Sequence, residues 1–112
     1  MSAVAGTTAQ KSAGSVRLEA EAAVQAIRDE AARRCLNATL HTNLARFTES
    51  GKLVLPVTLE SVSWNAYEKA CLLIALEDAW NERDPPPNLR LFVTSPASLI
   101  EMSTVGTLDD LP

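Results

Sequence analysis

An apolar run of seven residues, from Ala70 to Leu76, is the longest in the chain. At about 100° per residue, such a run covers every side of an α-helix and leaves it without a polar face. Charged residues flank the run, which is much shorter than the roughly 20 residues that a bilayer-spanning helix takes. The pattern therefore predicts a central helix within residues 59–84, capped by Thr58, ended by Pro85 and buried on most sides.

A second helical pattern extends from residue 15 to about residue 36. Its apolar positions recur at helical spacing and are mostly small: Ala20, Val24, Ile27, Ala31 and Cys35. This stripe predicts a long N-terminal helix. A stripe with a shifted phase follows, made of Leu36, Leu40, Leu44 and Phe47. It predicts a bend near residues 36–38 and a further helix, closed by Gly51 in a left-handed cap. The two cysteines, Cys35 and Cys71, fall within predicted helices and are expected to be buried.

Two shorter segments favour β-structure. Residues 52–57 predict a strand, and Pro56, which lacks an N–H, restricts that strand to a sheet edge. Residues 89–93 follow the alternating pattern of a strand, with Leu89, Leu91 and Val93 on one side, and predict a second strand. Strands joined through a long helix would pair in parallel, but two strands alone are rarely stable, so pairing with another chain stays open. Residues 97–103 are expected to add one or two helical turns.

These elements together predict an α+β fold that is helix-dominated, with a long N-terminal helix, a central buried helix and one or two short strands. A chain of 112 residues has room for one compact domain, which we assign to residues 15–104. Residues 1–14 are rich in Ala, Ser, Thr and Gly and are expected to form a disordered N-terminal arm. Residues 105–112 are expected to form an acidic C-terminal tail.

The net charge of −4 is unevenly distributed. Residues 1–52 carry seven basic and five acidic side chains, whereas residues 53–112 carry three basic and nine acidic ones. An acidic second half argues against binding of a phosphate backbone there. A small regulatory protein that binds nucleic acid through its N-terminal basic side is an alternative function. Its candidate residues are Arg28, Arg33, Arg34, Arg46 and Lys52.

The residues that catalysis and metal binding require are scarce. The chain has one histidine, His41, and two isolated cysteines, so no set of closely spaced zinc ligands is present. Its four glycines are scattered and form no phosphate-binding loop. We therefore assign no catalytic residue, metal or cofactor and expect a protein that is not an enzyme, with a small enzyme lacking known motifs as a further alternative. The N-terminus has no apolar signal segment, which predicts an intracellular location (cytoplasmic, nuclear or virion-internal) rather than secretion.

Aromatic and acidic residues on the central helix suggest a binding surface. Most of the apolar content is Ala, Leu and Val, and alanine buries little area, so one thin helix covers the central run poorly. Trp and Tyr are enriched among residues that dominate interface energies. The sequence thus predicts a non-enzymatic protein–protein interaction or assembly subunit, folded as a homo-oligomer or within a larger complex. The predicted interface comprises Trp64, Tyr67 and Trp80 with an acidic rim of Glu77, Asp78, Glu82 and Asp84.

Overall fold

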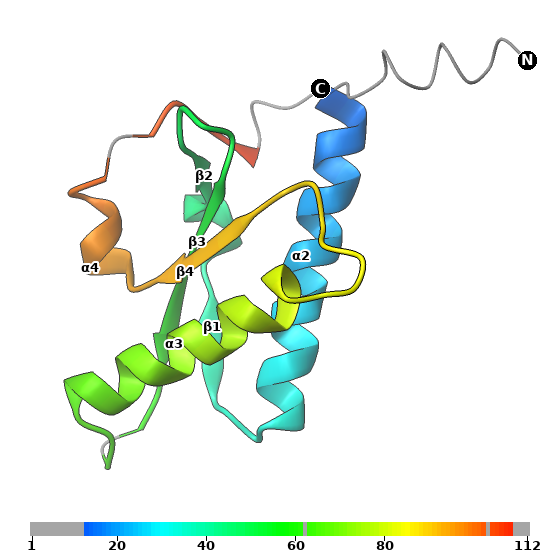
Figure 1. Cartoon of the computed structure of the whole chain (residues 1–112). Helices are drawn as coiled ribbons and strands as arrows, with labels where there is room; N and C mark the ends of the chain where they lie inside the picture. Colours follow the sequence, from blue (N-terminus) through cyan, green and yellow to red (C-terminus); the bar gives the residue numbers. More distant parts are fainter. Residues whose placement is uncertain (1–12, 62, 103, 109–112) are drawn as a thin grey trace, which may run out of the picture.

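A seven-residue strand, β3 (Leu53–Leu59), is the centre of the fold. The computed structural model describes residues 13–61, 63–102 and 104–108. In chain order the described elements are α2 (Ala13–Arg33), β1 (Ala38–Leu40), the 3-10 helix η1 (Thr42–Leu44), β2 (Arg46–Phe47), β3, α3 (Ala66–Asn81), β4 (Leu91–Thr94), α4 (Pro96–Leu99) and β5 (Gly106–Thr107). Helices α2 and α3 pack on each other and on the strands, while α4 lies on the side away from α2 (Figure 1).

The described strands form one mixed sheet. On one side β3 pairs in parallel with β4, and Leu53 lies opposite Leu91. On the other side β3 pairs antiparallel with β1 through its C-terminal half and with β2 through its N-terminal half. Strand β5 pairs antiparallel with β2. The predicted parallel pairing of the two strands around the central helix is confirmed. The predicted helix-dominated fold with one or two short strands is wrong, because the described residues contain five strands.

The missing strands come from residues 38–47, for which the sequence predicted a helix. In the structure this segment is β1, η1 and β2 in succession, running antiparallel to β3 as one interrupted strand. Pairing with the apolar β3 therefore overrides the helical spacing of the leucines. Thr39 and Thr42 also suit this outcome, since β-branched residues favour strands and disfavour helix interiors.

Pro56 sits in the central strand rather than at a sheet edge. Its carbonyl accepts a hydrogen bond of 2.9 Å from the His41 N–H, so the N–H that proline lacks would face the same neighbour. At that point the neighbouring segment leaves the sheet as η1. The interruption opposite Pro56 removes the need for a donor there, and this is why a proline is tolerated in the middle of the sheet.

Helix α2 ends two residues before Cys35, in a Schellman turn. The Cys35 N–H bonds to the Ala32 carbonyl at 3.0 Å, and the Leu36 N–H bonds to the Ala31 carbonyl at 2.8 Å. Cys35 takes the left-handed conformation with φ of 59°, although it is not glycine. The side chain points into solvent, as does that of Cys71, so the prediction of two buried cysteines is wrong.

Helix α3 begins later than predicted. Its N-cap is Asn65, whose side chain accepts from the Glu68 N–H at 2.8 Å while the Glu68 carboxylate accepts from the Asn65 N–H at 2.9 Å. Thr58, the predicted cap, lies in β3 instead and its hydroxyl is 2.7 Å from Nε2 of His41. Gly51 does have a positive φ, of 88°, but it closes the turn between β2 and β3 rather than a helix.

The core lies between the sheet and the two long helices. It is formed by the small side chains of α2, by alternate residues of β3 and β4, and by Leu76 and Trp80 of α3. On α3 only these two side chains are buried, so the prediction of a helix buried on most sides is wrong. The reason is geometric: α3 packs on α2 and β4 with one side, and no third described layer covers the opposite side.

The chain ends lie partly outside the described residues. Residues 1–12 of the predicted arm and residues 109–112 of the predicted tail belong to that undescribed part. Within the expected tail, Gly106 and Thr107 form β5, and the Leu108 carbonyl accepts from an Arg17 guanidinium N–H at 2.9 Å.

The left-handed Cys35 generates a stability prediction. A non-glycine residue in this conformation costs about 1 kcal/mol or more, so Cys35→Gly should raise the free energy of unfolding by about 0.5–1 kcal/mol. The matched variant Cys71→Gly places glycine inside a helix and should lower it by about 1 kcal/mol. Urea denaturation of both variants measures the two changes. A loss of stability in Cys35→Gly would contradict the strain assigned to this turn.

Candidate functional site

Side chains of α3 satisfy the backbone of β4, which pairs with β3 alone among the described strands. Asn81 donates from Nδ2 to the Leu91 carbonyl at 2.8 Å, and its Oδ1 accepts from the Leu91 N–H at 3.0 Å. Glu77 accepts from the Val93 N–H at 3.0 Å. The Trp80 indole N–H donates to the Leu89 carbonyl at 2.7 Å, just before the strand. A free strand edge invites pairing with another chain, and these bonds occupy it.

This anchoring determines which side of α3 faces outward. The outward side carries Tyr67, Ala70, Cys71 and Ile74, which recur at i, i+3, i+4 and i+7 and form one stripe along the helix. We call these four residues the α3 stripe. Tyr67 is 77 % exposed and Ile74 is 56 % exposed, although both are large and apolar. Ser63 and Asp78, also exposed, lie beyond the two ends of the stripe.

The stripe has internal contacts of its own. A hydrogen bond with the Cys71 side chain, one helical turn along, raises the pKa of the Tyr67 phenol. The ordinary value for tyrosine is already about 10, so the phenol stays neutral at physiological pH. Tyr67 therefore presents an uncharged ring with one polar end, which is the kind of side chain that suits a protein interface.

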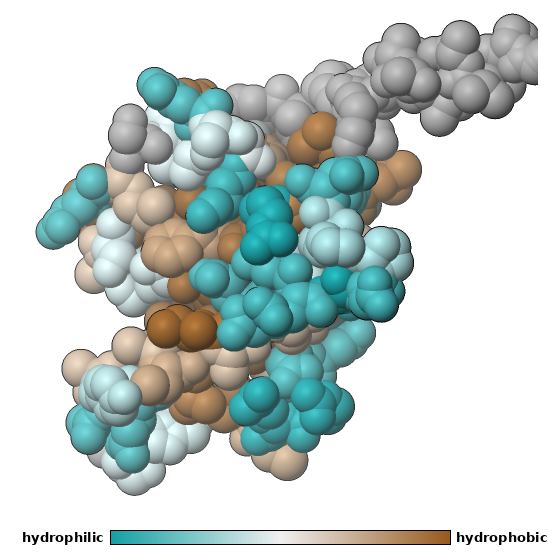
Figure 2. All heavy atoms as spheres, in the orientation of Figure 1, coloured by the Kyte–Doolittle hydropathy of each residue, from teal (hydrophilic) through white to brown (hydrophobic). Residues whose placement is uncertain are grey.

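A groove of about 440 Å³ borders the stripe between α3, β4 and α4. Ala70 and Ile74 belong both to the stripe and to the groove wall. Phe92 on β4 and Ser98 on α4 line the other side. Figure 2 shows apolar surface along α3 and where α3 faces β4. The stripe and the groove together form a continuous apolar region, and Lys69 is the charged residue among the groove's lining side chains.

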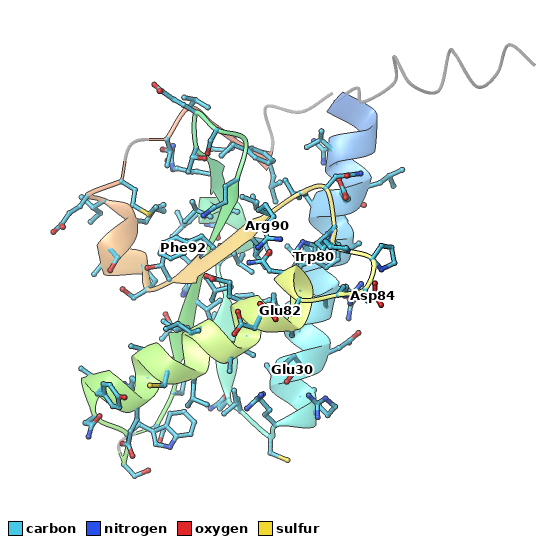
Figure 3. All side chains as sticks on the ribbon, viewed as in Figure 1. Glu30, Trp80, Glu82, Asp84, Arg90 and Phe92 are labelled. Carbon is cyan, nitrogen blue, oxygen red and sulfur yellow. The ribbon has the colours of Figure 1, made fainter. Side chains whose placement is uncertain are left out.

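The structure distributes the seven predicted interface residues over different environments. Tyr67 and Asp78 are exposed on or beside the stripe, whereas Trp64 is half-buried against the core. Trp80 is 4 % exposed, and Glu77 is bonded to β4. Figure 3 shows Trp80 near Glu82 and Asp84 at the C-terminal end of α3. Glu82 and Asp84 are exposed there, so the structure does not bring the seven side chains to one surface.

The five basic residues of the alternative function are also dispersed. Arg33 and Arg34 both bond to the Glu30 carboxylate at 2.6 Å, and these two hydrogen bonds lower the pKa of Glu30. The Lys52 ammonium lies 5.9 Å from the centre of the Phe92 ring. Lys52 follows the β2–β3 turn, at the end of the molecule opposite the C-terminus of α2 (Figure 1). Arg28 is exposed on α2 and Arg46 is half-buried in β2.

Of the four stripe residues, Tyr67 is an interface candidate from the sequence, whereas Ala70, Cys71 and Ile74 are not among the candidates named from it. Within the described residues, no group of three or more His, Cys, Asp or Glu side chains is placed to hold a metal ion. None of the described helices combines the length and the apolar character needed to cross a membrane. Comparison of the chain with known protein families, with curated proteins and with solved structures finds no match. The exposed surface of the described residues is therefore the basis for proposing a function.

The bonds at the β4 edge generate a second prediction. Asn81→Ala leaves the N–H and the carbonyl of the buried Leu91 without their partners, and each unsatisfied buried group costs about 1–3 kcal/mol. We expect the free energy of unfolding to fall by about 2 kcal/mol and the Leu91 amide to exchange faster with solvent. Asn43→Ala, at an exposed position in η1, is the matched control and should change stability by less than about 0.5 kcal/mol. Equal changes in the free energy of unfolding in both variants would show that Asn81 does not stabilise the edge of β4.

Proposed function

We propose that this chain is a non-enzymatic protein–protein interaction or assembly subunit that binds its partner through the α3 stripe. The supporting observation is the exposure of Tyr67 and Ile74 on a helix whose other side is anchored to the fold. Because anchoring fixes the direction of the stripe, binding requires little reordering of the helix. Pre-organisation of this kind lowers the entropic cost of association. The proposal retains the expected intracellular location.

Isolated apolar side chains on a surface are ordinary and need no partner. Leu18 on α2 is of this kind. Ile100, at the C-cap of α4, and Val105, just before β5, each line a groove of their own, of about 570 and 340 Å³. The α3 stripe differs because it places two large exposed apolar side chains, those of Tyr67 and Ile74, on one helix face beside a groove. Covering such a region would gain about 25 cal/mol for each Å² of apolar surface removed from water.

The arrangement of basic residues favours nucleic-acid binding less. A phosphate backbone is bound by a continuous positive surface, and Arg33 and Arg34 already share the Glu30 carboxylate. Lys52 lies apart from them beside Phe92. We therefore propose that the chain binds another protein chain. Nucleic-acid binding is retained as the alternative, and salt-dependent binding to DNA or RNA would support it.

The experiment compares two exposed positions. Ile74→Glu places a charge in the stripe, and an interface centred there should lose about 2 kcal/mol of association, roughly 30-fold in affinity. Leu18→Glu makes the same change on α2, where the exposed leucine lies outside the stripe, and should leave association unchanged. The tagged full chain is purified at its natural level from the cells that produce it, and the stoichiometric protein bound to it is quantified.

A partner, whether another protein or a second copy, should be retained by the wild type and by Leu18→Glu and lost by Ile74→Glu. Circular dichroism verifies that both variants keep the wild-type helix content, which is expected because both side chains are largely in solvent. Equal retention of every bound protein by Ile74→Glu and the wild type would refute the proposed interface.

A further inference from the structure

We infer that the partner of the α3 stripe is a second copy of this chain, bound as an antiparallel α3–α3 pair around a two-fold axis. The inference rests on the proposed function and names its partner. The axis passes between Ala70 and Cys71, at the middle of the stripe. The inference follows from the order of the four stripe residues along α3, which reads the same in both directions, as a two-fold pair of antiparallel helices requires.

The four stripe residues follow a palindromic order of size. Along α3 they are large, small, small and large: Tyr67, Ala70, Cys71 and Ile74. A two-fold interface uses the same patch on both copies, so each residue must suit the one at the mirrored position. Both mirrored pairs share one midpoint, between residues 70 and 71. In an antiparallel pair, Tyr67 thus meets Ile74 of the second copy, and Ala70 meets Cys71.

The sizes of these side chains fit a helix crossing. Helices pack with their axes about 8–10 Å apart, and small residues at the crossing point allow the closest approach. Ala70 and Cys71 provide that space at the centre. Tyr67 and Ile74 then lie on either side of the crossing, where the larger gap between the helices accommodates them. The two large exposed apolar side chains of α3 are covered together in this arrangement.

Charge favours the antiparallel orientation over the parallel one. Asp78 lies in the last turn of α3, where the negative end of the helix dipole disfavours a carboxylate. In the antiparallel pair it lies near the N-terminus of the second α3, whose positive end favours a carboxylate, and the Glu68 carboxylate of that first turn is held by its own bond to the Asn65 N–H. The two Asp78 carboxylates are then about 22 Å apart at 1.5 Å per residue, beyond the screening length of about 8 Å. A parallel pair would place them side by side.

The size of the surface predicts a weak, reversible dimer. A single pair of helices buries less than the roughly 1,200–2,000 Å² typical of stable interfaces. The groove along Ala70 and Ile74 extends the surface toward Phe92 and α4 and brings a second copy into contact with more than one element. We therefore expect association in the micromolar range, observable as a mass that rises with protein concentration.

The first measurement is the mass of the purified full chain by sedimentation over about 1–300 µM, a range that brackets the expected affinity. The mass should rise from 12.0 kDa toward twice that value for the wild type and for Leu18→Glu. Ile74→Glu should weaken dimerisation about 30-fold or more. Tyr67→Ser tests the same contact from the mirrored side and should weaken it as well. A single-chain mass at every concentration, or a dimer that neither substitution weakens, would overturn the inference.

The second measurement tests the orientation with a short bis-maleimide of about 8 Å, which joins two thiols by simple addition. With Cys35→Ser, the remaining Cys71 should cross-link to its counterpart near the axis. With Cys71→Ser, the exposed Cys35 at the end of α2 should not. In a background lacking both cysteines, chains carrying Ser63→Cys and chains carrying Asp78→Cys should cross-link to each other when mixed, and neither should cross-link to itself.

Self-cross-linking of either introduced cysteine would indicate a parallel pair and would refute the proposed geometry. If the purified chain does not dimerise, its partner is not a second copy. The proposed function is tested separately, by whether Ile74→Glu loses a protein that the wild type retains when purified from cells. A different protein retained there by the wild type and lost by Ile74→Glu would support the interface while excluding self-association. The two proposals thus fail on different observations.

Discussion

The bonds between α3 and the edge of β4 are the constraint on which the rest of the structure depends. A two-residue offset along the strand, from Leu91 to Val93, is matched by a one-turn offset along the helix, from Asn81 to Glu77. Helix and strand therefore lie alongside each other in one register only. That register buries Leu76 and Trp80 and leaves the α3 stripe outside. Polar bonds, rather than the distribution of apolar residues, determine which side of this helix is covered, because α3 is apolar on both sides.

The sequence predicted the elements whose signals are local and strong. The alanine stripe of α2, the strands around residues 53–57 and 91–93, and their parallel pairing across α3 all follow from periodicity and from the length of the connection. Residues 38–47 were mispredicted because leucines spaced like those of a helix also suit a strand broken by η1. No local signal places that segment against β3. Cys35 offered no warning either, since a left-handed turn without glycine or asparagine is invisible in the sequence.

The candidate site was predictable in kind but not in detail. The poor cover that one thin, alanine-rich helix gives the central run predicts a surface on that helix, and Tyr67 is among its candidate residues. The enrichment of tryptophan at interfaces makes Trp80 a candidate, and the sequence cannot reveal its burial because its indole partner, the Leu89 carbonyl, lies in a loop that the sequence cannot position. Glu77 was read as part of an acidic rim for the same reason, although its carboxylate serves β4. Burial of one side of an all-round apolar helix depends on long-range contacts, so Ile74 could not be separated from Leu76 by pattern alone.

A helix that is apolar on every side has two explanations in a chain this small. Either it is enclosed by its own domain, or its two sides serve two different surfaces. The single sheet and α2 can enclose only one side, and a polar residue at position 74 would cost the isolated chain little because more than half of Ile74 is in solvent. Covering that exposed part of Ile74 would gain further free energy. The absence of an amphipathic period in α3 is therefore consistent with one side that stabilises the fold and another that stabilises a complex, and the mirrored order of residues around Ala70 and Cys71 favours a complex between identical chains.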